Sequence, residues 1–357
     1  MTVGPLVEKE LRWLRRNWRA VAVVFLLAPA AFGLATASFD RTLPRDVPVA
    51  VAPASDAVTE DERQAVAGLA RGVSAPRQYD SPAAARTAMA RERVYGVLTV
   101  EHGVYESGAN VTLGFSVAGS MVTYVEPSRV VTGTLRERAN VFPAEITVDH
   151  RVVGPTRTLP EFLFTAGLVY LLAGYAFTYV PYHLARERQV FDRIRVESSL
   201  WSLLAAKAAL FGGLGAAAVA SMALAGIALG YRVAVASPAA LAVLGATGVA
   251  LVAVGLGVGF LTRFSVVGRF VNVALLGILV AFSNPVYPSG FFSVVRRTVS
   301  GWSPVYHATV VVRGLALAGR DPGLFADRLL LVGGVAVAAL AFLAGSVVVY
   351  QRGGRDG

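Results

Sequence analysis

Long apolar stretches alternate with charged segments along the chain, and this pattern predicts several membrane-spanning helices. Each stretch has about twenty residues or more, which at 1.5 Å per helical residue is enough to cross a hydrocarbon core of roughly 30 Å. Charged residues gather between the stretches because a charge at the bilayer centre costs about 2.5–3.5 kcal/mol. Six spans are expected from this pattern, at residues 20–39, 160–182, 203–230, 238–262, 266–318 and 325–350.

The fifth of these stretches is interrupted. Its apolar run stops at a group of helix breakers, Ser-Asn-Pro-Val-Tyr-Pro-Ser-Gly at 283–290, and a half-helix with Arg313 follows at 305–318. Broken backbone at membrane depth is tolerated only where it is buried in protein or lines a wet cavity. We therefore expect a re-entrant helical hairpin on the outer side.

The fourth stretch is rich in glycine, which predicts close packing of this helix against its neighbours rather than exposure to lipid. Small residues let two helices approach backbone to backbone. The glycines concerned are Gly245, Gly248, Gly255, Gly257 and Gly259.

Residues 40–158 are polar and predict a folded extracytoplasmic α+β domain between the first and second spans. Thr59 followed by Glu62 forms a capping box, and Ser81 followed by proline is a second helix start. A third helix beginning at Val122 is expected to lead back to the membrane. Alternating apolar residues predict strands at 47–52, 94–100 and 111–117.

Residues 1–19 predict an amphipathic helix that lies along the headgroups of the inner leaflet. Leu11, Leu14 and Trp18 fall on one side at helical spacing, and Arg15 belongs to a parallel row of charged residues. The alternative is a plain charged flank of a signal anchor.

The segment 183–202 separates the second and third spans and carries seven charged residues between positions 186 and 197. Its remaining apolar residues keep a helical period, which indicates a short amphipathic helix at the membrane surface with a face free for a partner. A solvated loop helix whose arginines only fix the topology is the alternative. The side chains of interest are Arg186, Glu187, Arg188, Arg193 and, at the start of the third span, Lys207.

Composition supports a membrane protein and limits its chemistry. Hydrophobic residues make up 55% of the 357 positions and charged residues 16%. Residues 40–158 hold 13 Arg and 14 acids, whereas the remaining chain holds 20 Lys or Arg and 9 acids, so the basic excess lies beside the apolar spans. This placement favours a membrane surface over nucleic acid as the cause of the charge. The absence of Cys excludes thiolate catalysis and Cys-ligated zinc.

The order of these features resembles the membrane subunit of the ABC-2 type (type V exporter) transporters. That family has a charged inner segment R-E-R-x-G-T-x-x-R-L after its second span and a Gly-Lys at its third. This chain has Arg186-Glu187-Arg188, Arg193-Ile194 and Ala206-Lys207 at matching spacing, with Val190-Phe191 in place of Gly-Thr. Towards the C-terminus, Ser289-Gly290-Phe291-Phe292, Ser303-Pro304-Val305-Tyr306 and Arg313 take the places of the family's Ser-Gly-x-Phe-Phe turn, Asn-Pro-x-x-Tyr stretch and arginine.

The resemblance implies an exporter permease that pairs with a second permease subunit, identical or paralogous, in the plasma membrane. A separate cytoplasmic ATPase would dock on the N-terminal amphipathic helix and on the segment 183–202. The chain itself has no phosphate-binding G-x-x-x-x-G-K-[ST] loop, and its four histidines are isolated in sequence. We expect no cofactor, no metal and no enzymatic activity in this chain.

Two other functions remain open at this point. The chain is a membrane-anchored envelope or binding protein if the extracytoplasmic domain is the working part, and an intramembrane enzyme if the spans hold a catalytic cluster. Both termini, including the tail 351–357, are expected in the cytoplasm because arginines concentrate there. The use of 31 Arg against two Lys suggests a GC-rich prokaryotic source, and Asn110-Val-Thr matches a glycosylation pattern that is common by chance.

Overall fold

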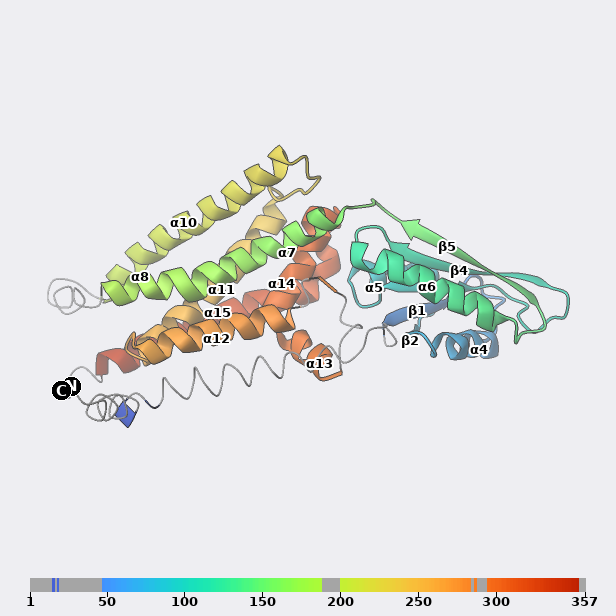
Figure 1. The fold of residues 1–357 in the computed structure, drawn as a ribbon, viewed down its shortest axis with the longest axis horizontal. Coiled ribbons are helices and arrows are strands. Elements are labelled where there is room, and N and C mark those ends of the chain that lie inside the picture. The colour runs from blue at the N-terminus through green and yellow to red at the C-terminus, as the bar shows by residue number, and fades with distance from the viewer. Residues whose placement is uncertain are drawn as a thin grey trace, which may run out of the picture.

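The computed structural model describes residues 15–16, 18, 47–187, 200–283, 286–287 and 294–352, without the side chains of 294–297. These residues form two regions placed end to end, a sheet domain (residues 47–158) and a helical region (residues 159–352) (Figure 1). We call the end of the helices next to the sheet domain the sheet end and the opposite one the far end. The predicted first span and positions 11 and 14 of the predicted amphipathic helix lie outside the described residues, whereas Arg15 and Trp18 are helical and exposed.

The sheet domain has one five-stranded sheet in the order β2-β1-β3-β4-β5. The first strand therefore lies inside the sheet, parallel to both of its neighbours, while β3 and β4 pair antiparallel and β5 runs parallel to β4 at one edge. The strands are β1 (Pro48–Pro53), β2 (Ala75–Gln78), β3 (Gly96–Val100), β4 (Asn110–Ala118) and β5 (Glu145–Val153). The helices of this domain are α4 (Glu60–Ala70), α5 (Pro82–Ala90) and α6 (Val122–Ala139).

The helix starts of the sheet domain follow the predicted caps. Thr59 and Glu62 form a reciprocal capping box at the start of α4, and the Ser81 side chain accepts a hydrogen bond from the backbone N–H of Ala84 at the start of α5. The predicted helix at Val122 exists as α6, but it does not lead back to the membrane. It ends at Ala139, and β5 instead brings the chain back to the helical region.

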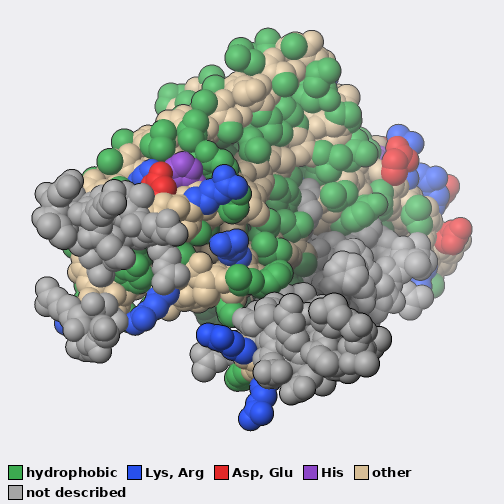
Figure 2. Space-filling model, turned by 60° about the vertical axis from the view of Figure 1, so that its left-hand side comes forward, with side chains coloured by type: hydrophobic (Ala, Val, Ile, Leu, Met, Phe, Trp, Pro, Cys, Tyr) green, Lys and Arg blue, Asp and Glu red, His purple; other side chains and the backbone are tan. Residues whose placement is uncertain are grey.

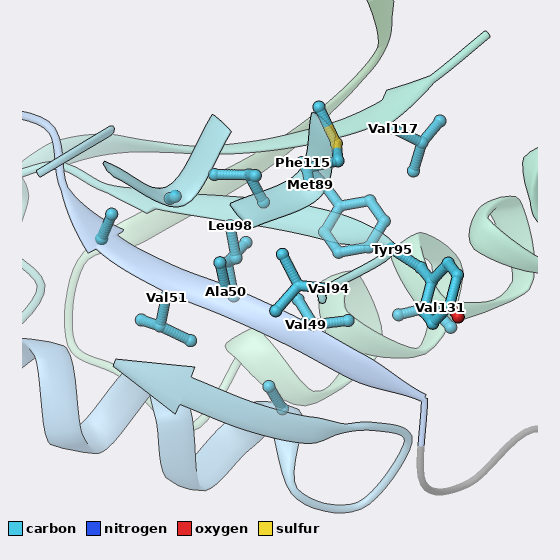
Figure 3. Packing of buried hydrophobic residues seen from close by; sticks show 14 of the residues in the cluster. Val49, Ala50, Val51, Met89, Val94, Tyr95, Leu98, Phe115, Val117 and Val131 are labelled. Atoms are coloured by element: carbon cyan, nitrogen blue, oxygen red, sulfur yellow. The ribbon is translucent and has the colours of Figure 1, made fainter. Parts of the chain in front are cut away.

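The core of the sheet domain is made by the strands β1, β3 and β4 and the helices packed on them (Figure 3). Val49 and Val51 of β1 and Leu98 of β3 pack with Phe115 of β4, and all four are essentially excluded from solvent. A Cβ on Gly96 would lie 2.7 Å from the Phe115 ring, so this position has to be glycine for the ring to fit. Burial of this apolar surface stabilises the domain by about 25 cal/mol per Å².

The helical region contains four helices long and apolar enough to cross a membrane, which are Leu159–Arg186, Leu200–Ala228, Pro238–Leu261 and Pro322–Arg352. They match four of the predicted spans to within a few residues. The first consists of α7 (Leu159–Gly174), a π-helical turn η2 (Tyr175–Tyr179) and α8 (Val180–Arg186). The other three contain α10 (Leu200–Ala228), α11 (Pro238–Leu261), and η5 (Pro322–Phe325) with α15 (Ala326–Arg352).

The remaining helical elements are shorter and fall in the predicted fifth stretch. They are α12 (Val266–Phe282), α13 (Val294–Trp302), α14 (Pro304–Val312) and the π-helical turn η4 (Arg313–Leu317). Ser289 and Gly290 of the predicted hairpin turn lie outside the described residues. Pro304 is the first residue of α14, whose start is capped by the Ser303 side chain.

The glycine-rich helix α11 lies inside the bundle, where it packs along α15 and also contacts α7, α12 and α14. A Cβ on Gly255 would lie 2.6 Å from the carbonyl oxygen of Ala176, so the backbones of α11 and η2 meet as the sequence predicts. The helix α10 is different. It leaves an apolar groove of about 1050 Å³ between itself and α7, α11 and α15.

Candidate functional site

The charged segment predicted at 183–202 is described at its two ends, and these ends are joined at the far end of the helices. Nζ of Lys207 donates a hydrogen bond to Oε1 of Glu187 at 2.7 Å and forms an ion pair with Oε2 of the same carboxylate at 2.6 Å. The Nε2 atom of His183 lies 3.0 Å from the same carboxylate. We call His183, Glu187 and Lys207 the far-end clasp; Figure 2 shows acidic, basic and histidine side chains close together at this end of the helices.

The clasp corrects and extends the sequence prediction. Residues 183–186 continue α8 rather than opening a separate helix, and 200–202 already belong to α10. Glu187 and Lys207 come together although they are twenty residues apart, whereas Arg186 lies over the Tyr182 ring at 4.7 Å. Arg188 and Arg193 lie outside the described residues. His183 was not predicted, although its spacing of four residues from Glu187 on one helix indicates a pair.

The clasp continues into the helices through stacked rings. Tyr175, Tyr179 and His183 stack in turn, with centroids 5.4 and 5.9 Å apart. The Tyr175 hydroxyl donates a hydrogen bond to the carbonyl oxygen of Phe211 on α10, at 3.1 Å. The far end of α10 is thus tied to η2 and α8 by one charged contact and one neutral contact.

A second polar contact lies at the sheet end and contains the predicted Arg313. Its guanidinium donates two hydrogen bonds to the carboxylate of Glu92, at 2.8 and 3.0 Å, and lies 4.4 Å from the centroid of the Phe162 ring. Both charged side chains are buried, with 5% of Arg313 and 10% of Glu92 exposed. Glu92 belongs to the turn after α5 and has a left-handed backbone conformation with φ of 53°. This conformation is unusual for a residue other than glycine, so the ion pair holds a constrained turn.

The two neighbours of Glu92 also contact the helical region. Nη2 of Arg328 donates to the carbonyl oxygen of Arg91 at 2.9 Å, and Arg93 forms an ion pair with Asp327. The Arg328 guanidinium lies 5.4 Å from the ring centroid of Tyr306, another predicted residue. We call the turn Arg91–Arg93 and its partners on α14, η4 and α15 the arginine joint. All three consecutive residues of the turn bind the helices.

The sheet domain holds a buried carboxylate with a structural role. Glu62 accepts hydrogen bonds from the backbone N–H groups of Thr59 at 2.8 Å and Gly103 at 2.6 Å, and its side chain lies 3.1 Å from Nδ1 of His102. Burial alone would raise the pKa of Glu62, but these hydrogen bonds outweigh it and lower the pKa from 4.5 to about 2. The hydrogen bond to Glu62 and its charge raise the pKa of His102. This carboxylate fixes the loop between β3 and β4.

No catalytic or metal site emerges from the described residues. Within them, no group of three His, Cys, Asp or Glu side chains could hold a metal ion. Ser128 and His150 lie 2.8 Å apart, but the serine is fully buried and its hydroxyl also contacts the carbonyl oxygen of Val125. This pair joins α6 to β5 and offers no accessible nucleophile. Comparison of the chain with protein-family models, curated proteins and solved structures finds no match.

Proposed function

We propose that this chain is the membrane-spanning permease subunit of an ATP-binding-cassette exporter of the ABC-2 type, driven by a separate cytoplasmic ATPase. It would work as a pair with a second permease subunit, identical or paralogous. Residues 20–39 would form a first span before the sheet domain, and α12, α13 and α14 a broken fifth element with an outer hairpin. The far end then faces the cytoplasm and the sheet domain lies outside.

The observation that carries this proposal is the far-end clasp. It links the residues on either side of the charged segment 188–199, since Glu187 comes directly before this segment and Lys207 lies eight residues after its end, in α10. The clasp remains partly open to solvent, with 33% of the Glu187 side chain and 15% of Lys207 exposed. A partner that binds the segment would therefore act on α8 and α10 together, as the coupling contact of a separate ATPase requires.

The packing of α10 supports a helix that changes its tilt during transport. Its far end is held by the clasp and by Tyr175. Its sheet end is held where Gly226 packs against the Phe164 ring, which a Cβ would approach to 2.7 Å. Between these ends the apolar groove separates α10 from α11. When a partner opens the contacts at the far end, α10 can tilt about its packed sheet end beside this groove without breaking a packed core.

A reconstitution experiment tests the proposal. The chain is co-expressed with a candidate ATP-binding-cassette ATPase subunit, purified in nanodiscs, and compared with the variant Glu187→Lys. We expect the parent to retain the ATPase and to respond to ATP with a change in accessibility of cysteines placed on α10. Glu187→Lys should uncouple these two readouts because it places two cations in the clasp, and Glu187→Lys with Lys207→Glu should restore part of the coupling. Arg269→Gln, an exposed arginine at the start of α12, serves as the matched control.

The competing function, an envelope protein whose sheet domain works alone, predicts a different result. In that case no ATPase co-purifies, and nucleotide leaves the labelling of α10 unchanged. Either outcome, found with correctly inserted protein, contradicts the exporter proposal. If Glu187→Lys and the double variant Glu187→Lys with Lys207→Glu both fail to insert, the clasp serves folding only.

A further inference from the structure

His307 on α14 uses both of its ring nitrogens in the arginine joint. Nε2 lies 2.7 Å from the carbonyl oxygen of Gly301, which can only accept, so Nε2 carries a hydrogen. Nδ1 lies 3.2 Å from Nη1 of Arg328, which can only donate, so Nδ1 offers its lone pair. The ring is therefore neutral while both hydrogen bonds exist.

Arg328 depends on this neutral ring. Only 8% of the residue is exposed, and among the described residues no carboxylate forms an ion pair with it. Its hydrogen-bond acceptors are Nδ1 of His307 and the carbonyl oxygen of Arg91 in the sheet domain. A proton on Nδ1 removes the first acceptor and places a second positive charge beside a guanidinium that is already buried.

The surroundings of the ring allow a proton to reach it. His307 is partly exposed. The charged groups facing it are Arg328 and Asp327. Burial of the ring and the charge of Arg328 oppose a positive charge on it in the docked form, whereas Asp327 favours one but is already paired with Arg93. The neighbouring Tyr306 ring lies at 5.3 Å on the same helix. The side chains of Arg296 and Arg297 on the adjacent α13 lie outside the description.

We propose that His307 makes the docking of the sheet domain on the helices sensitive to acid. Protonation of the ring releases Arg328 from His307, the freed guanidinium moves away from the new charge, and the bond to the Arg91 carbonyl is lost. The turn Arg91–Arg93 then keeps only its contacts through Glu92 and Arg93, and the domain separates from the helices more often. This behaviour is a property of the chain itself and does not require an ATPase.

Distance measurements between two spin labels test the proposal in the full chain. The chain has no Cys, so Arg86→Cys on the exposed side of α5 and Leu330→Cys on the lipid-facing side of α15 provide two unique sites. In nanodiscs we expect one distance at about pH 7.5 and a second, longer one at about pH 5.5, because the ring of the separated form, released from Arg328, should titrate near the ~6.5 of an ordinary histidine. The equilibrium constant for separation should rise about tenfold, as for loss of one hydrogen bond to a charged group.

Three variants decide whether His307 is the cause. His307→Gln can keep both hydrogen bonds and does not titrate, so it should show the docked distance at both pH values. His102→Gln removes a histidine of the sheet domain that lies outside the joint and should keep the response, whereas Arg328→Gln should separate at both pH values. An unchanged distance in the parent, a response that persists in His307→Gln, or one that disappears in His102→Gln would each overturn the proposal.

Discussion

The two ends of the helical region hold their charges in opposite ways. At the sheet end, Arg313 and Glu92 are almost completely buried, form two hydrogen bonds and lie against an aromatic ring. At the far end, Glu187 and Lys207 form equally short contacts but remain partly exposed. A buried charge that loses its partner cannot recover hydration, whereas an exposed one can. At neutral pH the sheet end is therefore a fixed joint, and the far end is a contact that a partner can open and close.

The largest effect is expected from breaking the buried pair. Arg313→Ala should lower the free energy of unfolding by about 3–5 kcal/mol because it leaves the Glu92 carboxylate buried without a partner. Arg93→Gln, which breaks the exposed ion pair of the same turn, should cost less than about 1 kcal/mol. Denaturant unfolding in detergent measures both values. Similar values for the two variants would show that burial does not distinguish them.

Lowering the pH should open the arginine joint before it unfolds the sheet domain. Because the pKa of Glu62 is lowered from 4.5 to about 2, its contribution is complete above about pH 4.5 and is lost as the pH falls towards 2. The shift corresponds to about 3 kcal/mol, which Glu62→Gln should remove at neutral pH. Circular dichroism of the parent should show a sheet domain that stays folded from about pH 7.5 to 5.5. Unfolding of the domain within this range would contradict the assignment of acid sensitivity to the joint.

The smallest effect is expected at the clasp. Lys207→Gln should change the free energy of unfolding by less than about 1 kcal/mol, since solvent reaches the Glu187 carboxylate that it leaves behind. The same variant should weaken the response of α10 to ATP much more strongly, if the exporter proposal is correct. Unfolding curves measure the change in stability, and cysteine labelling of α10 on the same preparation measures the response to ATP. If Lys207→Gln instead lowers the free energy of unfolding by several kcal/mol, the clasp is a structural contact like the arginine joint.

Features that depend on neighbouring residues were predictable from the sequence. The capping box of Thr59 and Glu62, the Ser81 cap and the four long apolar helices are all present. The close approach at Gly255 followed from the glycine content of its helix. The short strand β2 and the edge strand β5 were missed because neither shows clear alternation of buried and exposed residues.

The contacts of the arginine joint could not be predicted from local sequence patterns. Arg313 was singled out as an arginine in an apolar half-helix, but its partner Glu92 is 221 residues away and belongs to another region. His307 carried no signal, since it looks ordinary beside its sequence neighbours. Only the folded chain brings the turn after α5 against α14 and α15. At the far end, by contrast, Glu187 and Lys207 were both identified because the charged segment that they enclose interrupts the apolar pattern.

The interior position of β1 has a consequence for how this chain matures. The strand that follows the predicted first span lies inside the sheet, between β2 and β3, and its partners at Ala75 and Gly96 are made later. If the sheet domain is exported as the exporter proposal requires, β1 remains an unpaired, strongly apolar strand until β3 has followed it through the membrane. Such a strand can be captured by other nascent chains. We expect the early steps of biogenesis to rely on a chaperone on the receiving side, even though the finished domain hides this strand completely.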